Sequence, residues 1–158
     1  MFDFLFNPKG RISRKGYLIA FLVPYLLLSQ IAPFIFIGTP IAGLLVLVSL
    51  FYLWPKYISV PIRRFHDMGV TGAYQLGFIA LYFMAAFITV QGLLSQIGDP
   101  EVFAAMNMDQ RMEAMQAAME SNPRAALGMF LIFGIEIAQM LLFGLMKGNK
   151  GPNQYGND

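Results

Sequence analysis

The densest group of chemically active side chains lies between Arg63 and Gly69. Arg63 and Arg64 provide two guanidinium groups, whose planar fork suits phosphate or carboxylate. His66 and Asp67 follow and could form an imidazole–carboxylate pair, and Gly69 permits a tight turn. Two interpretations stay open. The group either binds a headgroup, a phosphate or a partner, or it is a positive membrane anchor in which Asp67 caps a helix or pairs internally with an arginine.

The rest of the chain offers little support for catalysis or metal binding. It contains one histidine and no cysteine, and neither H-E-x-x-H nor G-x-S-x-G occurs. His66 and Asp67 have no accompanying nucleophile, and a single histidine among scattered acids matches no metal-ligand spacing. We therefore expect no enzyme activity, no catalytic residue, no metal and no cofactor.

The composition indicates a membrane protein. Of 158 residues, 57% are hydrophobic and only 13% are charged, against about a quarter charged in soluble domains. The charges gather in short clusters between long apolar runs, so lipid is the expected solvent. A net charge of +2, with no basic stripe, gives no reason to expect nucleic acid.

Four stretches are long enough to cross a bilayer, which needs about 20 apolar residues in a helix. The predicted spans are residues 17–37, 41–62, 73–94 and 125–146. Only Gly38-Thr39-Pro40 separates the first two, which predicts a tight hairpin, and Pro24 and Pro33 should kink or shorten the first. The sequence thus predicts an all-α fold, a single membrane domain over residues 1–158. Close helix packing is expected at small residues: Gly77, Ala80, Gly134 and Ala138.

The distribution of Lys and Arg predicts the orientation. With the N-terminus inside, the outer side holds only Arg111 and Arg124, and the inner side holds the other nine of the 11 cations: Lys9, Arg11, Arg14, Lys15, Lys56, Arg63, Arg64, Lys147 and Lys150. Lys56 is close enough to a span end for its ammonium to reach the headgroups. Both termini are therefore predicted to be cytoplasmic, with a tail over residues 147–158, and the first span is a retained anchor rather than a cleaved signal.

The long outer connection contains a predicted amphipathic helix over about residues 100–121. Asp99-Pro100-Glu101 provides a start signal and Asn122-Pro123 a stop. Four methionines share one face of this helix, flanked by acids: Met108, Met112, Met115 and Met119. This face is expected to lie on the membrane surface or against the bundle, and methionine also suits a surface that accepts a partner.

Three segments together resemble the DUF805 family of small bacterial inner-membrane proteins. They are Phe6–Arg14 (F-N-P-K-G-R-I-S-R), Pro61–Gly69 (P-I-R-R-F-H-D-M-G) and Gly148–Gly156 (G-N-K-G-P-N-Q-Y-G). The resemblance covers nearly the whole chain and implies the membrane architecture and the bacterial inner membrane, but the family name denotes unknown function. The tail is either a frayed terminus or docks through Asn153 and Tyr155 onto the basic segments, and the family pattern favours docking. The longer outer connection and Glu136 are departures from the family pattern.

The leading hypothesis is a non-enzymatic accessory or scaffold subunit. It binds anionic membrane lipid, another membrane protein or a second copy of itself through a cytoplasmic basic face. The candidate binding residues are Arg11, Arg14, Arg63, Arg64, His66, Asp67, Asn153 and Tyr155. The alternative is a small oligomeric transporter or channel-like protein.

The alternative depends on Glu136, a lone acid near the middle of the fourth span. An acid at that depth costs about 3 kcal/mol by insertion scales, which favours the neutral, protonated form. On a helix, Gly134 and Ala138 lie opposite Glu136. If that small face packs inside the bundle, Glu136 points to a partner helix or a cavity and bonds to Gln139 or a neighbouring chain. Otherwise it bonds within the monomer, to Gln30, Gln91 or a backbone carbonyl.

Overall fold

The structure is a computed structural model that describes residues 5–36, 39–97 and 100–156. Its elements are helices, as the sequence predicts, and an isolated bridge joins Asn153 to Gly156 in the tail. The chain falls into two compact units. The first unit contains Met1–Gly77 and Met140–Asp158, and the second contains Phe78–Gln139.

The first apolar segment of the first unit is a helix that alternates between π and α geometry. Its parts are η1 (Gly16–Leu22), α2 (Val23–Tyr25), η2 (Leu26–Ile31) and α3 (Ala32–Ile35). Pro24 lies in the first turn of α2 and has no N–H to donate to the preceding turn, a condition under which a helix widens locally. The apolar helix found here, Gly16–Ile31, continues into α3, and residue 37 of the predicted span 17–37 lies outside the described part.

The second apolar segment follows as α4 (Pro40–Phe51), η3 (Pro55–Ser59) and α5 (Val60–Asp67). α3 contacts α4, in agreement with the predicted hairpin. The apolar helix runs over Gly43–Asp67 and so continues beyond residue 62, and the motif arginines lie on a helix, not in a loop. The helix ends where Gly69 takes a φ of +78°. Val70 N then donates to Phe65 O at 3.1 Å, as in a glycine-terminated helix.

Two further long helices, α6 (Tyr74–Ile97) and α9 (Pro123–Leu145), match the third and fourth predicted spans closely. α6 begins in the first unit and continues into the second, and α9 begins in the second unit and ends in the first. Three helices of the described chain are long and apolar enough to cross a membrane: Gly43–Asp67, Tyr74–Ser95 and Pro123–Leu145. These helices confirm the prediction of a helical membrane protein.

The outer connection holds two helices where one was predicted. α7 (Pro100–Ala105) ends before Asn107, and α8 (Met108–Ser121) begins after it. The Asn107 side chain accepts from Gln110 N at 2.9 Å, and the Gln110 side chain accepts from Asn107 N at 3.0 Å. This reciprocal cap starts a new helix, because asparagine offers the backbone a local alternative to continuing the old one. The predicted start at Asp99 lies outside the described residues.

Inside the second unit α6 and α9 approach closely, but not at the predicted small residues. A Cβ added to Gly128 would lie 2.6 Å from Thr89 N, and one added to Gly92 would lie 2.4 Å from Ala125 N. A Cβ on Gly134 would meet nothing within 4 Å, and Ala138 is exposed. The two helices therefore pack through Gly92 and Gly128, which lie closer to the connection between α6 and α9 than the small residues that the sequence suggested.

The core of the first unit is largely aromatic. The ring of Phe143, near the end of α9, lies 5.6 Å from Tyr17 and 5.1 Å from Phe65. Phe21 continues the row, with its ring 5.9 Å from Tyr17 and 6.2 Å from Tyr52. Such edge and tilted ring pairs add to the stabilisation from buried area. They fix the last turn of α9 beside η1 and α5 and so position the polar cluster described below.

Candidate functional site

Arg64, in α5, is fully buried and binds the C-terminal end of α9. Its exposed fraction is 0%. Its Nε donates to Phe143 O at 2.9 Å, and its Nη2 donates to Met146 O. The last carbonyls of a helix have no partner within that helix, so a buried cation that satisfies them acts as a C-terminal cap. Arg64 therefore joins the second apolar helix to the last one.

Asp67 lies one turn after Arg64 and pairs with two arginines. Its Oδ1 accepts from Arg11 Nη2 at 3.1 Å, and its Oδ2 accepts from Arg64 Nη1. Asp67 is itself buried, with 6% of its surface exposed. The internal pairing left open by the sequence is thus the one observed. We refer to Arg11, Arg64 and Asp67 as the arginine–aspartate cluster.

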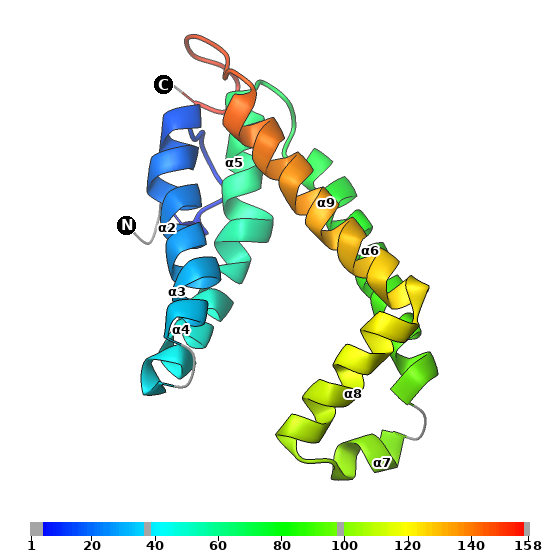
Figure 1. Cartoon of the computed structure of the whole chain (residues 1–158). Helices are drawn as coiled ribbons and strands as arrows, with labels where there is room; N and C mark the ends of the chain where they lie inside the picture. The colour runs from blue at the N-terminus through cyan, green and yellow to red at the C-terminus, as the bar shows by residue number, and fades with distance from the viewer. Residues whose placement is uncertain (1–4, 37–38, 98–99, 157–158) are drawn as a thin grey trace. The chain divides into compact units, whose positions relative to one another are not determined.

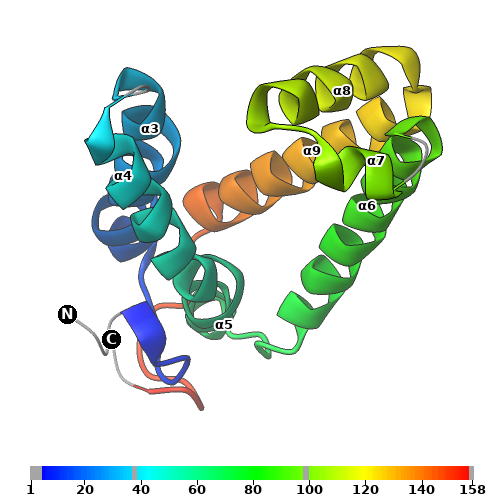
Figure 2. The same cartoon turned by 90° about the horizontal axis from the view of Figure 1, so that it is seen from below.

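The tail lies against this cluster at the end of α5 (Figure 2). Asn149 N donates to Asp67 O at 2.8 Å. Arg11 returns two bonds to the tail, to Asn149 O and to Gly151 O, each at 2.7 Å. A Cβ on Gly148 would lie 2.0 Å from Asp67 Oδ2, so the tail backbone contacts the carboxylate directly. The cluster therefore connects the N-terminal segment, α5 and the tail.

His66 holds the rest of the tail. Its Nδ1 donates to Gly10 O at 3.0 Å, and its ring stacks on Tyr155 with centroids 3.9 Å apart. Asn153 Nδ2 donates to His66 O at 2.9 Å, and Asn153 Oδ1 accepts from Tyr155 N at 2.9 Å. The structure thus places Asn153 and Tyr155 on the basic segment, where the family resemblance implied. The imidazole–carboxylate pair is not formed, because Asp67 is engaged by the arginines.

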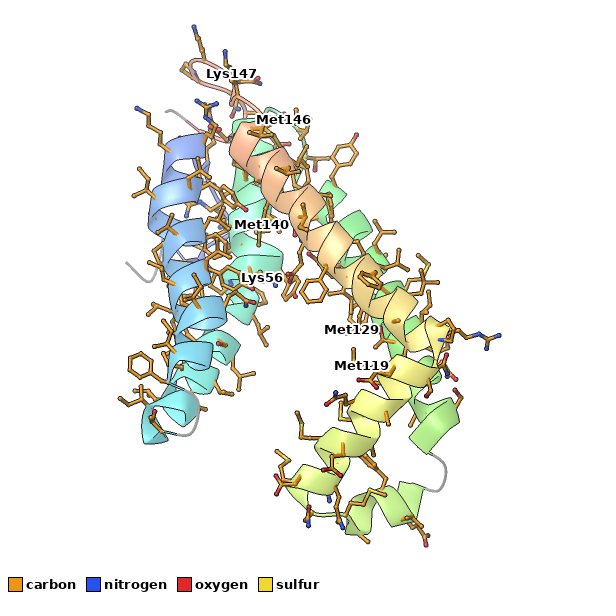
Figure 3. The ribbon with its side chains drawn as sticks, viewed as in Figure 1. Lys56, Met119, Met129, Met140, Met146 and Lys147 are labelled. Carbon is orange, nitrogen blue, oxygen red and sulfur yellow. The ribbon has the colours of Figure 1, made fainter. Side chains whose placement is uncertain are left out.

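The other predicted binding residues differ in exposure. Arg63 is half-buried, and its Nη2 donates to Arg11 O at 3.0 Å, whereas Arg14 is exposed. Among the described residues of the first unit, Asp67 is the only acid, and it is occupied within the cluster. The exposed Lys and Arg side chains of this unit, here called the exposed cations, are Lys9, Arg14, Lys15, Lys147 and Lys150. Figure 3 marks Lys147 at the start of the tail.

Lys56 lies in η3, and its Nζ lies over two tyrosine rings, 5.1 Å from the centroid of Tyr25 and 4.8 Å from that of Tyr57. The ring faces attract the ammonium and help to hold this cation in place.

Glu136 belongs to the second unit and is half-buried in α9. One turn further on, Gln139 is buried and its Oε1 accepts from Tyr82 at 3.4 Å. Gly134 and Ala138 are exposed, so the small face of α9 does not pack inside its unit. The orientation of Glu136 toward a partner helix or a cavity stays a prediction.

Sequence reasoning missed two features of the cluster. It did not identify the α9 carbonyls as the partners of Arg64, because backbone acceptors leave no mark in a sequence. It also gave Gly148 no role, although three glycines in one short tail, Gly148, Gly151 and Gly156, were a signal of tight turns.

Long apolar helices, with a buried ionic cluster at the end of one of them, define a helical membrane protein. The chain matches the family described as "Protein of unknown function (DUF805)" over residues 5–157, and it belongs to that family. No curated protein and no solved structure matches it. The match includes all three segments that meet in the cluster.

Proposed function

We propose that this protein is a non-enzymatic subunit of the bacterial inner membrane that binds anionic phospholipid headgroups through its exposed cations. The observation that carries the proposal is the division of the basic residues in the first unit. Arg11 and Arg64 are engaged within the chain, whereas Lys9, Arg14, Lys15, Lys147 and Lys150 are exposed. Arg11 and Arg64 thus build the support, and the exposed cations around it do the binding.

Electrostatics favour an anionic membrane surface as the ligand. Each cation near such a surface contributes about 1 kcal/mol, and the described part of the first unit offers no exposed acid to offset the five exposed cations. The tail brings Lys147 and Lys150 to the segment that carries Lys9, because Arg11 bonds to Asn149 O. The positive charges therefore act together, and the binding should weaken as salt screens them.

The absence of enzyme activity is part of the same proposal. The group that resembled a catalytic pair is engaged otherwise. The His66 ring donates to Gly10 and stacks on Tyr155, and the Asp67 carboxylate accepts from two guanidinium groups. A base that must take a proton from a substrate needs a free, well-placed acceptor, and a carboxylate held between two cations is a poor one.

The test compares the lipid that co-purifies with matched variants in mild detergent. Replacing all five exposed cations with Gln should lower the bound anionic lipid, and so should raising the salt concentration for the wild type. The control is Arg124→Gln, which removes an exposed cation from the other unit and should leave the lipid content unchanged. If the five-residue variant keeps its anionic lipid, the proposal fails. Loss of a co-purifying protein without loss of lipid would show a protein partner instead.

The orientation has its own test. Single cysteines at Ser13 and Gln154, both exposed, should resist an impermeant thiol reagent in intact cells, because the positive segments stay in the cytoplasm. A cysteine at the exposed Ser121 should react. The opposite labelling pattern would place the exposed cations outside and contradict the proposal.

A further inference from the structure

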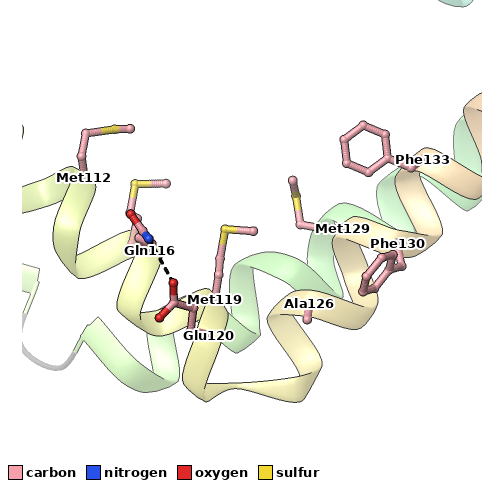
Figure 4. Close-up of a pocket in the computed structure, with 9 residues that line it drawn as sticks. Met112, Gln116, Met119, Glu120, Ala126, Met129, Phe130 and Phe133 are labelled. Atoms are coloured by element: carbon pink, nitrogen blue, oxygen red, sulfur yellow. Dashed lines mark hydrogen bonds between the residues drawn. The ribbon is translucent and has the colours of Figure 1, made fainter.

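A pocket of about 530 Å³ lies in the second unit between α8 and α9. Its lining is dominated by methionine and phenylalanine: Met112, Met115, Met119, Met129, Phe130 and Phe133. Figure 4 shows the side chains of Met119 and Met129 extending into the same space from the two helices. The volume lies within the range of about 300–1,000 Å³ that small-molecule sites occupy.

The polar atoms of the lining are few, and they bond to each other. Gln116 Nε2 donates to Glu120 Oε1 at 3.0 Å across one turn of α8. No cation is among the residues that line the pocket, so it has nothing to attract a phosphate. The remaining surface is thioether and phenyl, which favours an apolar occupant through burial of hydrocarbon. Because methionine is unbranched and flexible, such a lining adapts to an occupant without a fixed shape.

The pocket is continuous with the part of α9 that crosses the membrane. Phe130 and Phe133 lie within the candidate span Pro123–Leu145 and are 75% and 54% exposed. Large exposed apolar side chains on a spanning helix contact hydrocarbon. The methionine face of α8 is open in the same way, with Met112 61% exposed. The nearest source of an apolar occupant is therefore the bilayer itself.

We propose that this pocket binds one acyl chain of a membrane phospholipid, held between the methionine face of α8 and the phenylalanines of α9. The site is separate from the exposed cations, which bind headgroups, and it belongs to the other unit. The proposal assigns a ligand to the methionine face of α8. From the sequence, this face could lie on the membrane surface, against the bundle or against a partner.

The experiment uses the full chain in vesicles that contain a phospholipid with a photoactivatable group on its acyl chain. After illumination, lipid adducts are mapped by mass spectrometry. Adducts should concentrate on the pocket residues of α8 and α9. Replacing Met112, Met115 and Met119 with Gln should reduce labelling of Met129 and Phe133 several-fold, because a polar amide disfavours hydrocarbon. Replacing the same three with Leu should retain the labelling, because the apolar surface remains.

The matched control is Met108→Gln. Met108 lies on the same face of α8 and is 73% exposed, but it does not line the pocket, so its replacement should change nothing. Labelling spread evenly over α9 and the exposed Phe83 and Phe87 of α6 would overturn the proposal. So would the absence of lipid adducts at the pocket residues of α8 and α9. Should the Gln variant fail to fold, Phe133→Ala, which opens the pocket at the other helix, must lower the labelling instead.

Discussion

The buried charges lie in the first unit, whereas large apolar side chains are exposed in both units. In the first unit Arg64 is 0% exposed and Asp67 is 6% exposed, although both are charged. In the second unit Phe83 is 74% exposed and Phe130 is 75% exposed, although both are apolar. A soluble protein would show the reverse arrangement in both places, because water favours exposed charge and buried hydrocarbon.

The difference shows which side chains hydrocarbon can solvate and which require partners from the chain. Hydrocarbon satisfies an exposed phenylalanine but cannot solvate a guanidinium, so a charge in or near the bilayer needs partners from the chain. The cluster provides them by bringing α5, the N-terminal segment and the tail to one carboxylate. The exposed apolar side chains of both units need no such partners, because lipid solvates them. Four predictions test this contrast, in order of decreasing effect.

The largest effect is expected for Asp67→Asn. The change leaves Arg11 and Arg64 buried without a counter-charge, and removing one member of a buried ion pair costs about 3–5 kcal/mol. The melting temperature in detergent should therefore fall strongly. The control is Asp109→Asn, in the exposed part of α8, which should alter stability by less than about 0.5 kcal/mol. Equal melting temperatures for the two variants would refute the buried pair.

Gly148→Ala should be the next most harmful change. Its Cβ would lie 2.0 Å from Asp67 Oδ2, so the tail must move away from the carboxylate, and such overpacking costs about 1–3 kcal/mol. Limited proteolysis should cut the tail of this variant faster than that of the wild type. Gly43→Ala is the control, because nothing lies within 4 Å of the added Cβ. A tail that stays protected in Gly148→Ala would show that it is held elsewhere.

Gly128→Ala and Gly134→Ala compare two positions of the same helix. At Gly128 the added Cβ would meet Thr89 N at 2.6 Å and should destabilise the contact of α6 with α9 by about 1–3 kcal/mol. At Gly134 it meets nothing within 4 Å and should stabilise α9 by up to about 1 kcal/mol. Thermal unfolding in detergent measures both. The reverse order would restore the small-residue face that the sequence suggested.

The smallest effect is expected for Glu136→Gln, and this variant also tests the transport alternative. Glutamine keeps the size and the hydrogen-bonding capacity, so stability should change by less than about 0.5 kcal/mol. In proteoliposomes with a pH-sensitive dye, wild type and variant should show the same background proton leak. A flux that is present in the wild type and lost with Gln would establish transport through Glu136, and Glu136→Leu would then show whether assembly also depends on it.

The sequence by itself determined the class of protein and most of its helices. Length and apolarity predict α6 and α9 to within a few residues, because a bilayer imposes a minimum length on any spanning helix. It also predicted that Gly69 permits a turn. It did not predict the break at Asn107, since that break depends on the hydrogen bonds that Asn107 and Gln110 form with each other.

Only the tertiary structure decided what the polar residues do. From the sequence, Arg11, Arg14, Arg63 and Arg64 are equivalent members of one basic face. In the fold Arg64 caps α9 and Arg11 pairs with Asp67, whereas Arg14 remains exposed. The physical reason is that the role of a charged group depends on the atoms within about 4 Å of it. Many of those atoms are the backbone carbonyl oxygens of Phe143, Met146 and Asn149, which lie far along the chain from the arginines. Every residue has such a carbonyl, so the sequence does not mark these partners.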